Sequence, residues 1–264
     1  MEPALVHMSG ERLLQRIANL AHDSMEGRAP GTIGEERTVR YLESEFRTMG
    51  LAPGNPDGTY VQDVPLVGLT PAVTASLRIG GETVALQGVR DYIASSRRVT
   101  PEVSVENSDL VFVGYGIVAP EYGWDDYKDV DVSGKTIVML VNDPGYATQD
   151  AQLFRGNAMT YYGRWTYKVE EATRQGAAAV LIVHTTEGAG YPWSVVETSF
   201  GGEQLALPRD ATSPLQLQGW ITLDAARRLF ATGGISFDEL FVRAARRDFQ
   251  PVFTGIRATL RTAG

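Results

Sequence analysis

The most informative pattern of hydrophobic and polar positions lies between residues 155 and 187. Residues 167–175 are good helix formers, and Gly176 stands where a left-handed C-terminal stop is expected. Residues 177–183 form an unbroken apolar run that ends in β-branched side chains, which is typical of a strand covered on both faces. This stretch therefore predicts a helix followed by a buried strand.

Further apolar runs predict more strands of the same sheet. Residues 110–113 (LVFV) and 135–141 (KTIVMLV) have the composition of buried strands. Shorter runs predict strands at 72–79, 82–86, 91–95 and 252–260, and an extended segment at 103–118 that is broken at Gly114 and Gly116. Together these runs predict an α/β fold of the α+β kind, in which a sheet is flanked by helices.

Two amphipathic helices are predicted near the N-terminus, at residues 11–21 and 35–49. Ser9 is placed to cap the first helix, and Gly50 is placed to stop the second. Because each helix has an apolar stripe, each needs a surface to cover it. A glycine-rich loop of turns is expected between them.

The C-terminal third of the chain has two more helical patterns, at residues 222–231 and 237–246. Thr222 is placed to cap the first of them. Before these helices, glycine and proline residues predict a long irregular region from about 187 to 217.

Composition and charge narrow the function classes. The chain has 264 residues, 43% of them hydrophobic, and a formal net charge of −8, with arginine pairs scattered along it. Nucleic-acid binding needs clustered basic side chains, so we expect no nucleic-acid partner, and each pair is expected to be a solvated surface. The absence of cysteine excludes thiolate metal sites. No apolar run reaches the roughly 18 residues of a membrane-spanning helix.

The residues that carry metal or hydrolytic chemistry are few. The histidines are His7, His22 and His184, and they are far apart in the sequence. We expect His184 to be a structural histidine and His22 to cap a helix end. The acidic loop at residues 125–131 is expected to be solvated, with a hard-cation site as the alternative. The sequence therefore contains no complete catalytic constellation and no predicted metal ligand.

Two stretches resemble a known enzyme family. LAHDSMEGRAPGTIGEERTVRYLESEF, followed by GLAP, resembles the opening helix pair of co-catalytic zinc aminopeptidases that carry an inserted protease-associated (PA) domain, relatives of glutamate carboxypeptidase and the transferrin receptor. VFVGYGIVAPEYGWDDYKDVDVSGKTIVMLVNDPG and YYGRWTYKVEEATRQGAAAVLIVHTTEGAGYPW resemble the inserted domain. The zinc-binding motifs of the family, which follow the insertion, do not occur in this chain.

The resemblance implies three segments. Residues 1–64 would be a helical part of the peptidase domain, residues 65–255 a PA domain built as a β-sheet sandwich or barrel with flanking helices, and residues 256–264 a return strand towards the missing catalytic domain. The chain would then cap the active site of a zinc aminopeptidase and help to select peptides. The alternative is a stand-alone PA-type module that binds peptides or proteins without hydrolysis.

The resemblance also sets expectations for cofactors, partners and location. This chain alone is expected to be inactive and to hold no cofactor, and two zinc ions are expected in the missing catalytic domain. The expected partners are a peptide substrate, that catalytic domain, and a second copy of the chain through the N-terminal helices. The implied location is periplasmic or secreted, with the signal peptide absent from this chain.

The candidate substrate-binding surface is aromatic and surrounds the helix at 167–175. Exposed rings contribute contact area at low entropy cost, and a guanidinium can bind a carboxylate with two hydrogen bonds. The alternative is that these rings only pack the helix against the sheet. The candidate residues are Tyr161, Tyr162, Arg164 and Trp165, with Tyr191 and Trp193 as a second wall.

Overall fold

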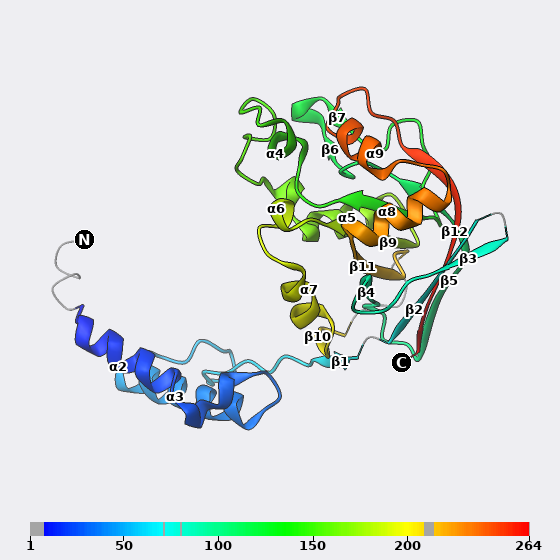
Figure 1. Ribbon diagram of the computed structural model, residues 1–264. Coiled ribbons are helices and arrows are strands. Elements are labelled where there is room, and N and C mark those ends of the chain that lie inside the picture. Colours follow the sequence, from blue (N-terminus) through cyan, green and yellow to red (C-terminus); the bar gives the residue numbers. More distant parts are fainter. Residues whose placement is uncertain (1–7, 71, 80, 209–213, 264) are drawn as a thin grey trace. The chain divides into compact units, whose positions relative to one another are not determined.

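The chain forms two compact units, residues Met1–Val64 and Pro65–Gly264 (Figure 1). The computed structural model describes residues 8–70, 72–79, 81–208 and 214–263. Within these residues, no helix is long and apolar enough to cross a membrane. The assignment of the two units to a peptidase domain and a PA domain stays a prediction.

The first unit contains helices α2 (Gly10–Leu20) and α3 (Ile33–Thr48) and the 3-10 helix η1 (Asp23–Arg28). Both predicted helices are confirmed. The Ser9 side chain accepts a hydrogen bond from the Arg12 amide, as an N-cap should, and Gly50 has the expected positive φ of 72°. In this unit α2 buries no residue and α3 buries only Gly34, so the apolar stripes remain largely exposed.

The second unit is built on an eight-stranded sheet with the order β3-β2-β12-β5-β8-β9-β11-β4. The adjacent strands β5, β8, β9 and β11 are parallel to one another, and the other pairings of the sheet are antiparallel. The predicted mixed α/β fold class is therefore confirmed. The strands are β2 (Val73–Ile79), β3 (Glu82–Ala85), β4 (Tyr92–Ser95), β5 (Glu102–Phe112), β8 (Thr136–Leu140), β9 (Ala179–His184), β11 (Leu217–Thr222) and β12 (Val252–Ala263).

The central strands are buried on both faces, as their unbroken apolar runs predict, and every residue of β8 and β9 is buried. Because successive side chains of a strand point to opposite faces, Val138 and Leu140 join one hydrophobic cluster, and Ile137 and Met139 join another. Helices α8 (Leu223–Thr232) and α9 (Phe237–Ala244) pack on the first cluster. Helices α5 (Trp165–Arg174) and α7 (Trp193–Phe200) pack on the second cluster.

Helix α5 (Trp165–Arg174) confirms the predicted helix, and Gly176 ends it with a φ of 72°. The prediction of an irregular region from 187 to 217 is wrong. That region contains the short helices α6 (Thr186–Ala189) and α7 (Trp193–Phe200) and strand β10 (Gln204–Ala206). These elements are too short to show a clear period, and their order depends on packing against the sheet.

Short elements complete the second unit. Strand β10 pairs with β1 (Val67–Leu69) in a separate two-stranded sheet, and β6 (Val118–Ala119) pairs with β7 (Trp124–Asp125). Residues 256–263, expected as a return strand, belong to β12 and pair with β2 and β5 inside the main sheet. The remaining helices are η2 (Pro120–Tyr122), α4 (Pro144–Thr148) and η3 (Tyr161–Gly163).

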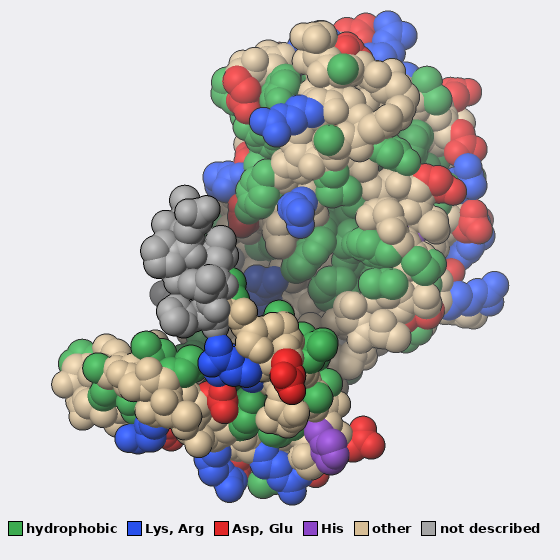
Figure 2. All heavy atoms as spheres, turned by 90° about the vertical axis from the view of Figure 1, so that its left-hand side faces the viewer, with side chains coloured by type: hydrophobic (Ala, Val, Ile, Leu, Met, Phe, Trp, Pro, Cys, Tyr) green, Lys and Arg blue, Asp and Glu red, His purple; other side chains and the backbone are tan. Residues whose placement is uncertain are grey.

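The arginine pairs at 227–228 and 246–247 lie at the surface and make ion pairs. Arg227 contacts Asp238 at 2.9 Å, Arg228 contacts Asp91 at 2.7 Å, and Arg246 contacts Asp248 at 3.0 Å. On the face shown in Figure 2, basic and acidic side chains are interspersed and form no broad basic field.

Candidate functional site

The sequence-predicted aromatic residues do not form one continuous surface. Tyr161 is 53% exposed, and its hydroxyl donates to Glu170 at 2.9 Å. Tyr162 packs against the cluster that α8 and α9 cover, and its hydroxyl donates to Glu121 at 2.6 Å. That hydrogen bond to a carboxylate raises the pKa of Tyr162 to about 12. Arg164 is exposed just before α5.

The other three predicted rings pack against the opposite cluster. Trp165 meets Phe200 edge-to-face, with ring centroids 5.3 Å apart. Tyr191 and Trp193 are half-buried against that cluster, and the Trp193 indole donates to the Val89 carbonyl at 2.9 Å. Four of the six predicted residues thus contribute to packing, and only Tyr161 and Arg164 are exposed. Whether any of them binds substrate stays a prediction.

His184 has the structural role expected of it. It is buried at the end of β9, and its Nε2 lies 3.0 Å from the Tyr191 carbonyl oxygen. Its ring centroid is 5.5 Å from that of Trp193. Because burial penalises the charged imidazolium, the pKa of His184 is lowered.

His22 also behaves as predicted, because its Nδ1 accepts the Ser24 amide at the start of η1. Among the described residues, no group of three or more histidine, aspartate or glutamate side chains could hold a metal ion. His7 lies outside the described residues. The described residues therefore do not fit a zinc site.

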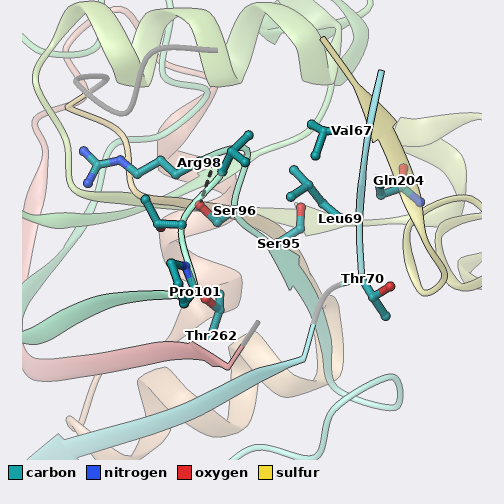
Figure 3. Close-up of a pocket in the computed structure, with 12 residues that line it drawn as sticks. Val67, Leu69, Thr70, Ser95, Ser96, Arg98, Pro101, Gln204 and Thr262 are labelled. Atoms are coloured by element: carbon teal, nitrogen blue, oxygen red, sulfur yellow. Dashed lines mark hydrogen bonds between the residues drawn. The ribbon is translucent and has the colours of Figure 1, made fainter. Parts of the chain in front are cut away.

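A hollow suited to a ligand lies where β4 ends, at the edge of the main sheet. Two adjoining cavities, of about 480 and about 400 Å³, share the lining residues Leu69, Ser95, Ser96 and Gln204. We call these two cavities together the β4 groove. Figure 3 shows Leu69 and Gln204 on one side of it, and Ser95, Ser96 and Arg98 on the other. Its volume falls in the range of about 300–1,000 Å³ that is typical of ligand sites.

The two cavities of the β4 groove differ in their further walls. Trp165 and Phe200 line the smaller cavity, so one sequence-predicted residue does reach the groove. Arg97 also lines the smaller cavity, and Arg98 lines the larger. No described lining residue of either cavity is an aspartate or a glutamate. The charged side chains among the described lining residues are therefore Arg97 and Arg98.

Sequence reasoning missed most of this groove. Its lining comes from segments around residues 67–70, 95–101 and 204–207 and from α5, which are distant in the sequence. One sequence feature does point to the groove: the Arg97-Arg98 pair directly after the strand predicted at 91–95. The sequence analysis interprets this pair as a solvated surface. Only the packing of the β1–β10 pair beside β4 reveals the site.

A second unusual cluster lies inside the unit, between α5 and the loops beside it. Lys168 is fully buried and donates a hydrogen bond to the Tyr115 carbonyl oxygen. Burial lowers the pKa of Lys168, while the charges of Asp126 and Asp143 oppose that shift. Burial raises the pKa of Asp126 and of Asp143. These interactions link α5 to the segments that carry Tyr115, Asp126 and Asp143.

The acidic loop at 125–131 therefore differs from the solvated loop that was predicted. Asp126 is only 2% exposed, accepts a hydrogen bond from the Ile117 amide at 3.0 Å, and accepts another from the Trp124 indole at 2.9 Å. Asp125 accepts a hydrogen bond from the Tyr127 amide, and Asp131 accepts one from the Ser133 amide. A run of acids gives no sign of which one turns inward, because that depends on donors from Ile117, just before β6, and from Trp124 in β7.

Comparisons with known proteins give structural similarity alone. No family model matches the chain, and no curated protein matches it. Among solved structures, an aminopeptidase from Aneurinibacillus sp. strain AM-1 is 20% identical with a TM-score of 0.39, over 94% of this chain and 44% of that one. BSAP, a zinc aminopeptidase from Bacillus subtilis, is 13% identical with a TM-score of 0.31, over 92% of this chain and 42% of that one. The chain thus spans less than half the length of either structure.

Proposed function

We propose that the second unit is a non-catalytic, PA-type domain that binds peptides in the β4 groove. The observation that carries this proposal is the composition of the groove, which joins an aromatic wall to hydroxyl and amide side chains. Peptides present apolar side chains and backbone polar groups, and the rings and the hydroxyl and amide side chains of the groove can contact these.

The aromatic wall supplies contact area. The Trp165 and Phe200 rings are half-buried and are held against each other at 5.3 Å, so little entropy is lost when a ligand side chain packs on them. The Ser95 and Gln204 side chains provide hydrogen-bonding groups close to this wall. Such a combination of fixed rings and adaptable polar groups is typical of peptide-binding surfaces.

In this proposal the chain works as part of a larger zinc aminopeptidase, in keeping with the resemblance of its sequence to that family. The groove would hold part of a substrate peptide and thereby favour some peptides over others. The two zinc ions, when bound in the catalytic domain, would activate water for hydrolysis. No residue of this chain is assigned to that chemical step.

The test is a comparison of three single variants in a peptide-binding assay. Trp165→Ala removes one wall of the groove and should weaken binding of a short peptide by about 1–3 kcal/mol. Tyr161→Ala removes an exposed ring that does not line the groove and serves as the matched control. Isothermal titration calorimetry measures the affinities, and thermal unfolding checks that each variant is folded.

The same experiment separates the groove from the surface predicted by sequence. Arg164→Ala should have little effect, because Arg164 does not line either cavity. If Tyr161→Ala and Arg164→Ala weaken binding while Trp165→Ala does not, the site lies before α5 and the groove assignment is wrong. A chain that binds no peptide at all would refute the proposed function.

A further inference from the structure

A third cavity adjoins the β4 groove and is lined by strands of the main sheet and by helices α5 and α7. Its volume is about 20 Å³, and it shares Ser95, Trp165, Phe200 and Gln218 with the smaller cavity of the groove. We call this cavity the apolar slot. Its other lining residues are Ile93, Ala94, Val169, Ile182, Gly219 and Trp220. No described residue that lines the slot carries a charge.

The register of β4 against β11 gives the slot a polar mouth and an apolar interior. Ser95 pairs with Gln218, and Ile93 pairs with Trp220. Because side chains alternate between the faces of a sheet, all four lie on one face, and Ile93 and Trp220 belong to the cluster on which α5 and α7 pack. Ser95 and Gln218 also line the groove, whereas Ile93 and Trp220 line only the slot. A side chain that enters from the groove thus passes two polar residues before it meets the apolar lining.

The aromatic walls of the slot hold one another in place. The ring centroid of Phe200 is 5.3 Å from that of Trp165 and 6.3 Å from that of Trp220. Trp220 is only 3% exposed, so the core fixes its ring. Closely packed walls cannot open for a bulky group without losing these contacts. The volume of the slot therefore limits which side chains can enter it.

We propose that the apolar slot is the specificity subsite of the β4 groove and receives one small aliphatic side chain of the bound peptide. This inference rests on the proposed function and names the class of peptide that the groove selects. A space of about 20 Å³ admits roughly one or two methyl-sized groups, whereas a cavity that holds a benzene ring measures roughly 150 Å³. A charged side chain would lose its hydration in the slot without gaining an ion pair. Valine is therefore expected to fit better than phenylalanine or aspartate.

The first experiment varies a single side chain of the peptide. Four peptides of the form Gly-Gly-Xaa-Gly-Gly, blocked at both ends, carry glycine, valine, phenylalanine or aspartate at the central position. Burial of one methyl group contributes about fourfold to affinity, so the valine peptide should bind about tenfold more tightly than the glycine peptide. The phenylalanine and aspartate peptides should bind at least about fivefold more weakly than the valine peptide, because one is too large and the other is charged. NMR titration measures the four affinities.

The second experiment enlarges the slot. Phe200→Ala removes one wall and should reverse the preference, so that the phenylalanine peptide binds more tightly than the valine peptide. Phe253→Ala is the matched control, because Phe253 is 53% exposed in β12 and lines neither the groove nor the slot. A change that merely loosened the protein would weaken both peptides without exchanging their order. Thermal unfolding checks that each variant is folded.

The third experiment fills the slot and decides the question if Phe200→Ala does not fold. Val169 is half-buried on α5 and lines the slot. Val169→Phe should remove the advantage of the valine peptide and leave binding of the glycine peptide unchanged. Val195→Phe is the control, because Val195 is 39% exposed on α7 and lines neither the groove nor the slot.

The outcomes bear differently on the two proposals. If all four peptides bind equally well, the slot selects nothing, this inference is refuted and the proposed function stands. If the valine peptide binds best but keeps its advantage in both Phe200→Ala and Val169→Phe, valine is recognised elsewhere and the slot assignment is wrong. If none of the peptides binds, the proposed function fails together with this inference.

Discussion

At the scale of single residues, Asp91 shows how a buried carboxylate is stabilised. Its side chain is 7% exposed, accepts the Gln87 amide at 3.0 Å, and pairs with Arg228 at 2.7 Å. Burial by itself would raise the pKa of Asp91, but these partners together hold it below its ordinary value of 3.8. The ion pair therefore links the loop before β4 to helix α8.

Arg228→Ala should destabilise the protein by about 1–3 kcal/mol at pH 7, because it leaves a buried carboxylate with fewer partners. A group whose pKa is lowered on folding stabilises the protein above its unfolded pKa, near 3.8, and loses that effect as pH falls through the folded value. The difference between wild type and variant should thus shrink below pH 4. Urea unfolding of both proteins at pH 7 and pH 3 measures this difference in unfolding free energy. The same difference at both pH values would contradict a stabilising ion pair between Asp91 and Arg228.

At the scale of elements, the position of β4 depends on a close approach at Gly219. This residue lies in β11 opposite Ala94, and a Cβ added there would be 2.7 Å from the Ala94 Cα and would also meet the Ile93 carbonyl oxygen. Backbone atoms cannot move aside as a flexible side chain can. The glycine therefore allows β4 to pair closely enough to border the groove.

Gly219→Ala should destabilise the second unit by about 1–3 kcal/mol, the usual cost of overpacking. Gly202→Ala is the control, because an added Cβ there has nothing within 4 Å. Chemical denaturation of both variants is the measurement. Equal stability of the two would show that β4 adjusts freely.

At the scale of the whole molecule, the first unit buries little: among its described residues, 8–64, only Gly34 is buried. Leu13, Leu14 and Ile17 of α2 are 59%, 68% and 52% exposed, and Phe46 of α3 is 37% exposed. One ion pair, Arg16 with Glu45 at 2.7 Å, joins the two helices. We predict that another protein surface covers these apolar stripes, because exposed stripes of this kind favour such contacts.

Hydrogen exchange should reveal this difference between the units. Amides of α2 and α3 should exchange much faster than those of the fully buried strand β9, because few buried contacts oppose their opening. Sedimentation at rising concentration tests the predicted self-association of the helices. Equal protection of α2 and β9 in a strictly monomeric sample would contradict a separate first unit.

The chain is also predicted to have no aminopeptidase activity by itself and to bind no stoichiometric zinc. Its histidines are far apart in the sequence, and cysteine is absent, so the usual convergent ligand set is lacking. An aminoacyl-anilide assay with added zinc, and metal analysis after dialysis, are the measurements. One tightly held zinc ion per chain would refute the prediction.

The sequence by itself determined the local elements and the buried strands. Ser9 and Thr222 cap their helices as predicted, and the apolar runs at β8 and β9 are buried throughout. A helix cap depends on residues only a few positions away, so it can be recognised from the local sequence. A strand that is buried on both faces appears in the sequence as an unbroken apolar run.

Only the tertiary structure decided where the groove lies and which polar residues are buried. Leu69, Ser95 and Gln204 meet because the β1–β10 pair lies beside the end of β4, which no local pattern records. Asp126 and Lys168 look like surface residues in the sequence, and their burial depends on hydrogen bonds from loops elsewhere in the chain. The location of the groove and the burial of these polar side chains depend on contacts between residues that are far apart in the sequence. The hydrophobic period shows only which face of a helix or strand is covered.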